Sequence, residues 1–348
     1  MSPARSSVWR LAFNCAAGTA AFVAVCAVGH RLAPFPAVPI VGPKLAYFER
    51  HAQEYDTIFV GSSRVYRQIA PQAFDDDLRA RGIESRSFNF GAPAMIPPES
   101  FFVLEKILPR RRPHLRWVFI EWAAVKTEIE KRKEGTIEVL YWHDWRQTAF
   151  LARTIAARHG ISRSSFTQKL WPHLQLFLRN TANVGRGTDF FAGADSAVRD
   201  RIEGNYARNG GYFGARGPSP LRLTDPAGYQ QMLAAVKRKA ERTKASGDNP
   251  RVTRVMLDAI DRIEDAVRAC GAEPVWFIPP TLENVSDALF VEDKTRTHTV
   301  FVFNRPELCA ELYRFDRRWD AEHLNEAGSR EFTHLLAVRF ADFLSRRQ

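Results

Sequence analysis

The chain contains the stretch Asp56-Thr57-Ile58-Phe59-Val60-Gly61-Ser62-Ser63-Arg64. Its β-branched and aromatic run, closed by a glycine, predicts a buried strand that delivers a tight turn. A serine in such a turn is presented at the edge of a sheet, near the positive end of any helix that follows. Gly-Ser-Ser is also a common turn composition, so the motif alone leaves an ordinary turn open.

The same rhythm of strand, turn and helix recurs on both sides of a long central stretch. Further strands are expected at residues 87–90, 116–120, 274–278 and 312–315, and helices at 99–108, 252–267 and 325–345. Alternation of this kind predicts an α/β fold with a central parallel sheet and helices on both faces.

Five segments are expected along the chain. They are an N-terminal tip and anchor (1–31), a Pro-rich linker (32–43), the first part of the α/β domain (44–125), a largely helical and aromatic insertion (126–250), and the second part of the domain (251–348). Within the insertion, helices are expected at 148–158 and around 170–178, followed by a glycine-rich passage at 204–217.

The N-terminal segment predicts a single-pass membrane anchor. Residues 11–29 carry no charge and follow Arg5 and Arg10, and a spanning helix needs about 17 to 25 such residues. The preceding cations favour a cytoplasmic N-terminus, with the rest of the chain in the periplasm of a bacterial-type cell. A cleaved signal peptide and a soluble protein with a core helix here are the alternatives, whereas Val25 is bulky for a lipidation site at Cys26.

Charge and cysteine content narrow the function classes. The net charge of +11 comes from 50 Lys and Arg against 39 Asp and Glu, but the basic residues are scattered and lack interleaved aromatic platforms, which argues against nucleic-acid binding. Outside the apolar segment only Cys270 and Cys309 remain. They could form a disulfide or stay as buried thiols, and their spacing indicates no metal site.

Two further motifs follow predicted strands. Asp320-Ala321-Glu322-His323 precedes the last helix, and a carboxylate three residues before a histidine can orient the imidazole as a general base. Asn89-Phe90-Gly91 ends the second strand, where a glycine lets a backbone N–H approach an oxyanion. A helix start with a surface histidine and a plain strand-ending glycine are the respective alternatives.

Together the three motifs resemble the SGNH/GDSL hydrolase superfamily, over residues 56–121 and 252–345. The resemblance implies a flavodoxin-like three-layer α/β/α fold, Ser63 as nucleophile, Asp320 and His323 as its acid–base partners, and the N–H groups of Ser63 and Gly91 as the oxyanion hole. Ser62 replaces the family's usual aspartate. The family's third motif normally supplies an asparagine as a further oxyanion donor, but Glu121-Trp122-Ala123-Ala124 stands there, and loss of one such donor costs about 10² to 10³ in rate.

Gly-Ser-Ser together with an anchor resembles proteins that work beside membrane-bound O-acyltransferases on cell-envelope polysaccharides. We therefore expect a cofactor-free, metal-free serine esterase or O-acyltransferase acting on an acylated carbohydrate or similar ester. Its substrate-binding candidates are Arg64, Trp122, Trp142 and Trp145, with Trp171 and Tyr212 as further aromatics that could stack on a sugar ring or simply pack within the insertion. The alternative is a catalytically weak or inactive scaffold that binds polysaccharide beside an O-acyltransferase.

Overall fold

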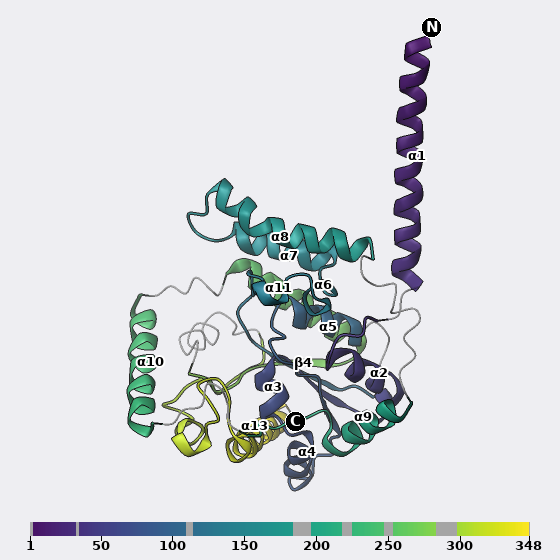
Figure 1. Ribbon diagram of the computed structural model, residues 1–348. Coiled ribbons are helices and arrows are strands. Elements are labelled where there is room, and N and C mark those ends of the chain that lie inside the picture. The colour runs from purple at the N-terminus through teal and green to yellow at the C-terminus, as the bar shows by residue number, and fades with distance from the viewer. Residues whose placement is uncertain are drawn as a thin grey trace.

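A computed structural model describes residues 3–32, 35–108, 114–183, 196–217, 225–246, 253–282 and 298–347 (Figure 1). The helices are α1 (Pro3–Leu32), α2 (Val41–His51), α3 (Ser63–Gln68), α4 (Pro71–Arg79), α5 (Glu99–Ile107), α6 (Ile137–Leu140), α7 (Trp145–Ala156), α8 (Arg163–Thr181), α9 (Ser196–Asn209), α10 (Pro226–Ser246), α11 (Arg254–Cys270) and α13 (Glu326–Ser345). Short 3₁₀ helices are η1 (Ala52–Glu54), η2 (Lys131–Lys133), η4 (Ala310–Tyr313) and η5 (Phe315–Arg317).

The centre of the fold is a five-stranded sheet in which every pairing is parallel. Its strands are β1 (Thr57–Val60), β2 (Ser87–Asn89), β3 (Trp117–Glu121), β4 (Glu273–Ile278) and β5 (Val300–Val302). They lie in the order β2-β1-β3-β4-β5, one of the two common orders of doubly wound sheets. The predicted α/β class with a parallel sheet is confirmed.

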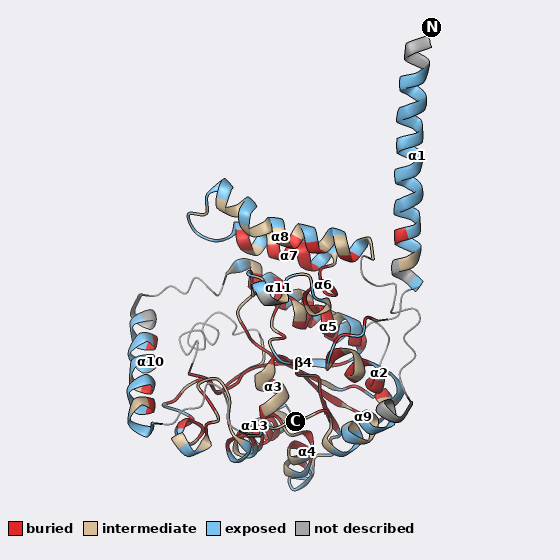
Figure 2. Ribbon diagram, viewed as in Figure 1, coloured by how far each residue is buried: buried red, intermediate tan, exposed pale blue. Residues whose placement is uncertain are grey.

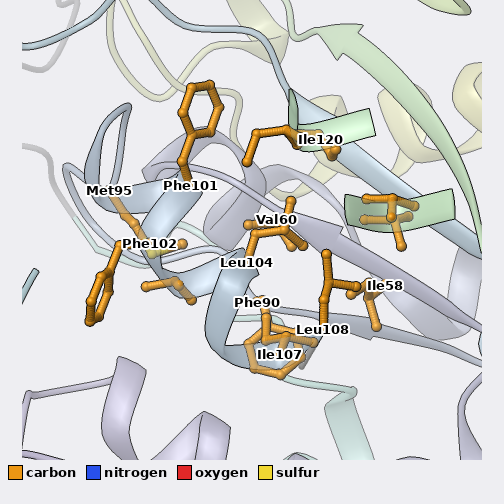
Figure 3. Packing of buried hydrophobic residues seen from close by; sticks show 14 of the residues in the cluster. Ile58, Val60, Phe90, Met95, Phe101, Phe102, Leu104, Ile107, Leu108 and Ile120 are labelled. Atoms are coloured by element: carbon orange, nitrogen blue, oxygen red, sulfur yellow. The ribbon is translucent and has the colours of Figure 1, made fainter. Parts of the chain in front are cut away.

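Two hydrophobic clusters cover the two faces of the sheet. Side chains at alternate positions of β1 point into different clusters, Ile58 and Val60 into one and Phe59 into the other. The first cluster contains residues of α2, α5 and α11, and Figure 3 shows Phe101 and Leu104 of α5 in the same cluster as Val60 of β1. The second contains residues of α3, α4 and α13. Because both faces are buried, the central strands β1, β3 and β4 are mostly apolar, and this made them recognisable in the sequence.

One predicted strand is wrong. Residues 312–315 fall in the two 3₁₀ helices η4 and η5, and the edge strand is instead β5. The Tyr313 hydroxyl donates to Asn304 Oδ1 at 2.7 Å inside the core, so these apolar residues are buried by a turn rather than by strand pairing. A short apolar run does not distinguish the two.

The N-terminal helix α1 stands away from the rest of the chain. Figure 2 shows it exposed along almost its whole length, and its segment Ser7–Gly29 is long and apolar enough to cross a membrane, with 6% of that window buried. Within the described residues it is not a core helix. The expected helices of the insertion are present as α7 and α8, both longer than predicted, while α9 and α10 had no counterpart in the prediction.

Candidate active site

The three predicted chemical motifs meet at the carboxyl end of the sheet. Strand β1 ends at Val60, and Ser63 is the first residue of α3. Ser62 caps that helix, its hydroxyl accepting the Arg64 N–H at 3.2 Å. The Asp320 loop lies directly before α13, which Asn325 caps through a bond from the Gly328 N–H. In doubly wound sheets this edge is where ligands bind.

Ser63, His323 and Asp320 form one hydrogen-bonded chain. Nε2 of His323 lies 2.8 Å from Ser63 Oγ, and Nδ1 lies 2.9 and 3.0 Å from the two carboxylate oxygens of Asp320. Because an ionised carboxylate only accepts, Nδ1 carries the ring proton and Nε2 is left as the acceptor for the serine hydroxyl. This is the arrangement that a general base needs to deprotonate a serine.

Asp320 is held in its charged form. Burial on its own would raise the pKa of Asp320, but the hydrogen bond and charge of His323, with the N–H groups of Glu322 and His323, together bring it below the ordinary value. Both of those N–H groups donate to Oδ1 at 2.8 Å. The carboxylate is therefore ionised at neutral pH and can stabilise an imidazolium on His323.

A buried arginine shapes the loop that carries Asp320. Arg318 donates from Nη2 to the Ala321 carbonyl at 2.6 Å, and from Nε to the Asp320 carbonyl at 3.3 Å. The Gln68 side chain on α3 donates to the Glu322 carbonyl at 3.1 Å, which connects the loop to the helix that begins with Ser63. Burial lowers the pKa of Arg318, yet a guanidinium remains protonated. Arg318 and Gln68 belong to no motif that was recognised in the sequence, so their contacts with this loop were not predicted.

Glu121 lies beneath the serine turn, in the place of the asparagine that the resemblance led us to expect. Its fully buried carboxylate accepts the Ser62 N–H at 2.5 Å and the Ser62 hydroxyl at 3.1 Å, and forms an ion pair with Arg64 Nε at 2.7 Å. A Cβ on Gly61 would lie 2.5 Å from this carboxylate. Glu121 thus fixes the backbone immediately before Ser63. The sequence signal was a carboxylate at the end of a buried strand together with an arginine next to the serine.

Gly91 packs against the helix that carries Ser63, but its N–H is engaged. A Cβ at Gly91 would lie 2.2 Å from the backbone nitrogen of Tyr66, so only glycine fits. Its N–H donates to Asn89 Oδ1 at 2.7 Å and would have to leave that partner before it could donate to an oxyanion. The Ser63 N–H, at the first position of α3, has no partner within the helix.

A buried lysine holds the loop of Gly91. Lys44 Nζ donates to the carbonyls of Asn89 and Gly91 at 2.7 and 2.8 Å and lies 4.6 Å from the centre of the Tyr66 ring. Burial lowers the pKa of Lys44 well below its ordinary value. The contacts join α2, β2 and α3 behind the nucleophile.

The predicted substrate-binding residues occupy different places. Arg64 lies beside the triad, but its guanidinium is taken up by Glu121. Trp122 and Trp142 are buried, and Trp142 lines a cavity whose lining does not include the triad. Trp145 is 66% exposed on α7. The structure therefore brings only Arg64 of these four next to Ser63.

A cavity of about 490 Å³ begins one helical turn from Ser63, at Tyr66, although its lining does not include the triad itself. Tyr66 stacks on Phe213 with ring centres 5.6 Å apart, and Tyr206 and Tyr212 also line the cavity. Glu326, at the start of α13, closes the same space. Aromatic rings with polar groups between them suit a carbohydrate, and Tyr212 is one of the aromatics that the sequence singled out.

The cysteines and the possible metal ligands can be followed through the part of the chain that the structure describes. Cys270 and Cys309 are separate buried thiols, so the disulfide alternative is wrong for this structure. Across the described ranges, no group of three or more His, Cys, Asp or Glu side chains could hold a metal ion.

No protein-family model matches the sequence, and no curated protein matches it either. The arguments for function therefore rest on the geometry of the site.

Proposed function

We propose that this chain is a serine-dependent acyl-transfer enzyme of the SGNH type, anchored in a membrane by α1 and acting on an ester of an extracytoplasmic carbohydrate. The observation that carries the proposal is the continuous hydrogen-bonded chain from Asp320 through His323 to Ser63. The sheet order, the same as in flavodoxin-like folds, and the position of the serine after β1 also support it.

The first step is acylation of the serine. His323 Nε2 takes the Ser63 proton as Oγ attacks the ester carbonyl, and the Ser63 N–H donates to the resulting oxyanion. When the intermediate collapses, the bond to the leaving alcohol breaks and the alcohol takes the proton from His323. An acyl ester on Ser63 remains.

The second step decides between hydrolysis and transfer. Water or a sugar hydroxyl gives its proton to His323 and attacks the acyl-serine, and Ser63 then leaves with that proton. The aromatic cavity that begins at Tyr66, one helical turn along α3 from Ser63, offers an acceptor sugar a surface on the same helix. This arrangement supports a carbohydrate as the acceptor and fits a role beside a membrane-bound O-acyltransferase.

A catalytically weak scaffold is the second candidate. It is favoured by Glu121 in place of an oxyanion asparagine and by the engagement of the Gly91 N–H with Asn89. Such a protein would bind polysaccharide at the same surface without turning over an ester.

Ester turnover by the full chain in detergent separates the two candidates. With p-nitrophenyl acetate as donor and a hexose oligosaccharide as acceptor, we expect p-nitrophenol release and acetylated sugar from the wild type. Both should be lost in Ser63→Ala. Equal release from wild type and Ser63→Ala would support the scaffold instead.

A further inference from the structure

The helical pair α7–α8 has an unusual charge composition. Residues 145–183 contain no Asp or Glu, although they contain six cations. These are Arg146, Arg153, Arg158, Arg163, Lys169 and Arg179. Arg153 and Arg163 are exposed. Lys169 and Arg146 face Glu128 and Glu105 of other segments. A helical pair without carboxylates of its own is nevertheless complementary to an anionic surface.

Large apolar side chains are exposed on the same pair of helices. Trp145 is 66% exposed, Trp171 55% and Leu178 60%. Trp171 and Leu178 lie seven residues apart on α8, so they fall on one face, with the half-exposed Leu174 between them. Exposed tryptophan and leucine beside arginine are typical of helices that lie in a membrane interface.

The position of α8 relates this surface to the candidate membrane span. Asn183, just after α8, donates from Nδ2 to the Cys26 carbonyl at 2.8 Å, and the thiol of Cys26 donates to the Ala182 carbonyl at 3.9 Å. Cys26 lies in the last turn of the segment Ser7–Gly29. In a spanning helix this turn lies at the boundary between hydrocarbon and headgroups.

The direction of α7 and α8 also agrees with a position at the boundary between hydrocarbon and headgroups. Figure 1 shows α7 and α8 extending sideways from near the lower end of α1, roughly at right angles to it, with the sheet farther from the free end of α1. A helix perpendicular to a membrane span lies in the plane of the membrane. The pair is therefore placed at the depth, and in the direction, of an interfacial helix.

We infer that the α7–α8 surface, defined by Trp145, Arg153, Arg163, Trp171 and Leu178, binds the anionic phospholipid headgroups of the membrane that α1 spans. The inference rests on α1 crossing the membrane but not on the acyl-transfer activity. With two attachments, the span and this surface, the catalytic domain has a fixed orientation toward the membrane.

The test uses a fluorophore on α8 in the full chain. Trp171→Cys, in a Cys15→Ser background, is labelled with an NBD group and reconstituted into nanodiscs of phosphatidylcholine with or without phosphatidylglycerol. The matched control is Leu308→Cys, which is 57% exposed and adjoins Cys309, in the cluster on the sheet face away from α11. Leu178→Cys is a second position on the tested surface.

We expect blue-shifted emission at 171 and 178, and quenching by lipids with a nitroxide near the headgroup that is several-fold stronger than at 308. The quenching should increase with phosphatidylglycerol and decrease in Arg153→Glu/Arg163→Glu. The inference would be overturned if aqueous iodide quenched the labels at 171 and 178 as strongly as the label at 308, and if nitroxide lipids quenched them no more strongly. The surface would then be left for a protein partner.

Discussion

Replacing Glu121 by Gln tests whether the buried carboxylate under the serine turn positions the nucleophile. The substitution keeps the shape of the side chain but removes its charge, and it places an amide where the Ser62 N–H and Arg64 Nε now donate. The amide NH₂ group of the new side chain then faces one of these two N–H donors, with no acceptor between them. Arg64 loses its ion-pair partner and keeps only the 3.3 Å contact of Nε with Ser62 Oγ, while its side chain is only 12% exposed.

The expected magnitude follows from that burial. Breaking a buried ion pair costs about 3–5 kcal/mol, and partial hydration of Arg64 reduces this to about 2–3 kcal/mol. For a domain of this size, we expect the Tm to fall by roughly 4–10 °C. Since a displacement of about 1 Å at a reacting group can cost 10²-fold, labelling of Ser63 by a fluorophosphonate should slow by about ten- to a hundredfold.

The matched control is Glu264→Gln. Glu264 is also buried and paired, with Arg268 at 2.6 Å and Trp276 Nε1 at 3.0 Å, but it lies on α11. It should lower the Tm by a smaller amount, because Arg268 is 48% exposed, and leave the labelling rate unchanged. If folded Glu121→Gln is labelled as fast as the wild type, Glu121 does not position the serine and the reasoning fails.

Three further outcomes follow from contacts and burial. Arg318→Lys should slow Ser63 labelling roughly tenfold, because the forked contacts of the guanidinium with the Asp320 loop are lost. Equal labelling rates for Arg318→Lys and the exposed control Arg346→Lys would show that Arg318 does not position that loop. Gly91→Ala should lower the free energy of unfolding in denaturant by about 1–3 kcal/mol or more, because its Cβ meets backbone. The control Gly204→Ala in α9 should raise the free energy of unfolding by up to about 1 kcal/mol. Similar denaturation midpoints for the two variants would refute the close approach of Gly91 to α3. Burial raises the pKa of Asp75 from 3.8 to about 7. Between these two values the folded chain retains a proton that the unfolded chain releases, so the free energy of unfolding should fall as the pH rises from about 4 to 7. Asp75→Asn should flatten that slope, and an unchanged slope would show that Asp75 is not the group responsible.

The sheet could be predicted because its strands are buried on both faces and read as continuous apolar runs. The run 312–315 was misassigned because apolar residues buried by a 3₁₀ turn have the same composition as a short strand. The proximity of Ser63, Asp320 and His323 could be predicted from the sequence, because the strand ends and the helix starts of a parallel sheet lie at the same edge.

The supporting contacts could not be predicted in this way. Glu121 meets Ser62 and Arg64 only through the register of β1 and β3, and Arg318 reaches its carbonyls through the fold of an irregular loop. That Glu121 stands where the resemblance led us to expect an asparagine could be seen in the sequence, whereas the contacts of the glutamate could not. The Gly91 motif led us to expect a close approach to an oxyanion, whereas the close approach in the structure is to the backbone of α3, and the bond from the Gly91 N–H to Asn89 depends on a local side-chain turn.

The most direct test of the account is the site of covalent modification by a fluorophosphonate probe in the full chain, located by mass spectrometry of the digested protein. We predict a single adduct on Ser63, absent in Ser63→Ala and strongly slowed in His323→Ala. A folded wild type that stays unmodified, or a Ser63→Ala variant that is labelled as readily as the wild type, would contradict the assignment of Ser63 as the nucleophile.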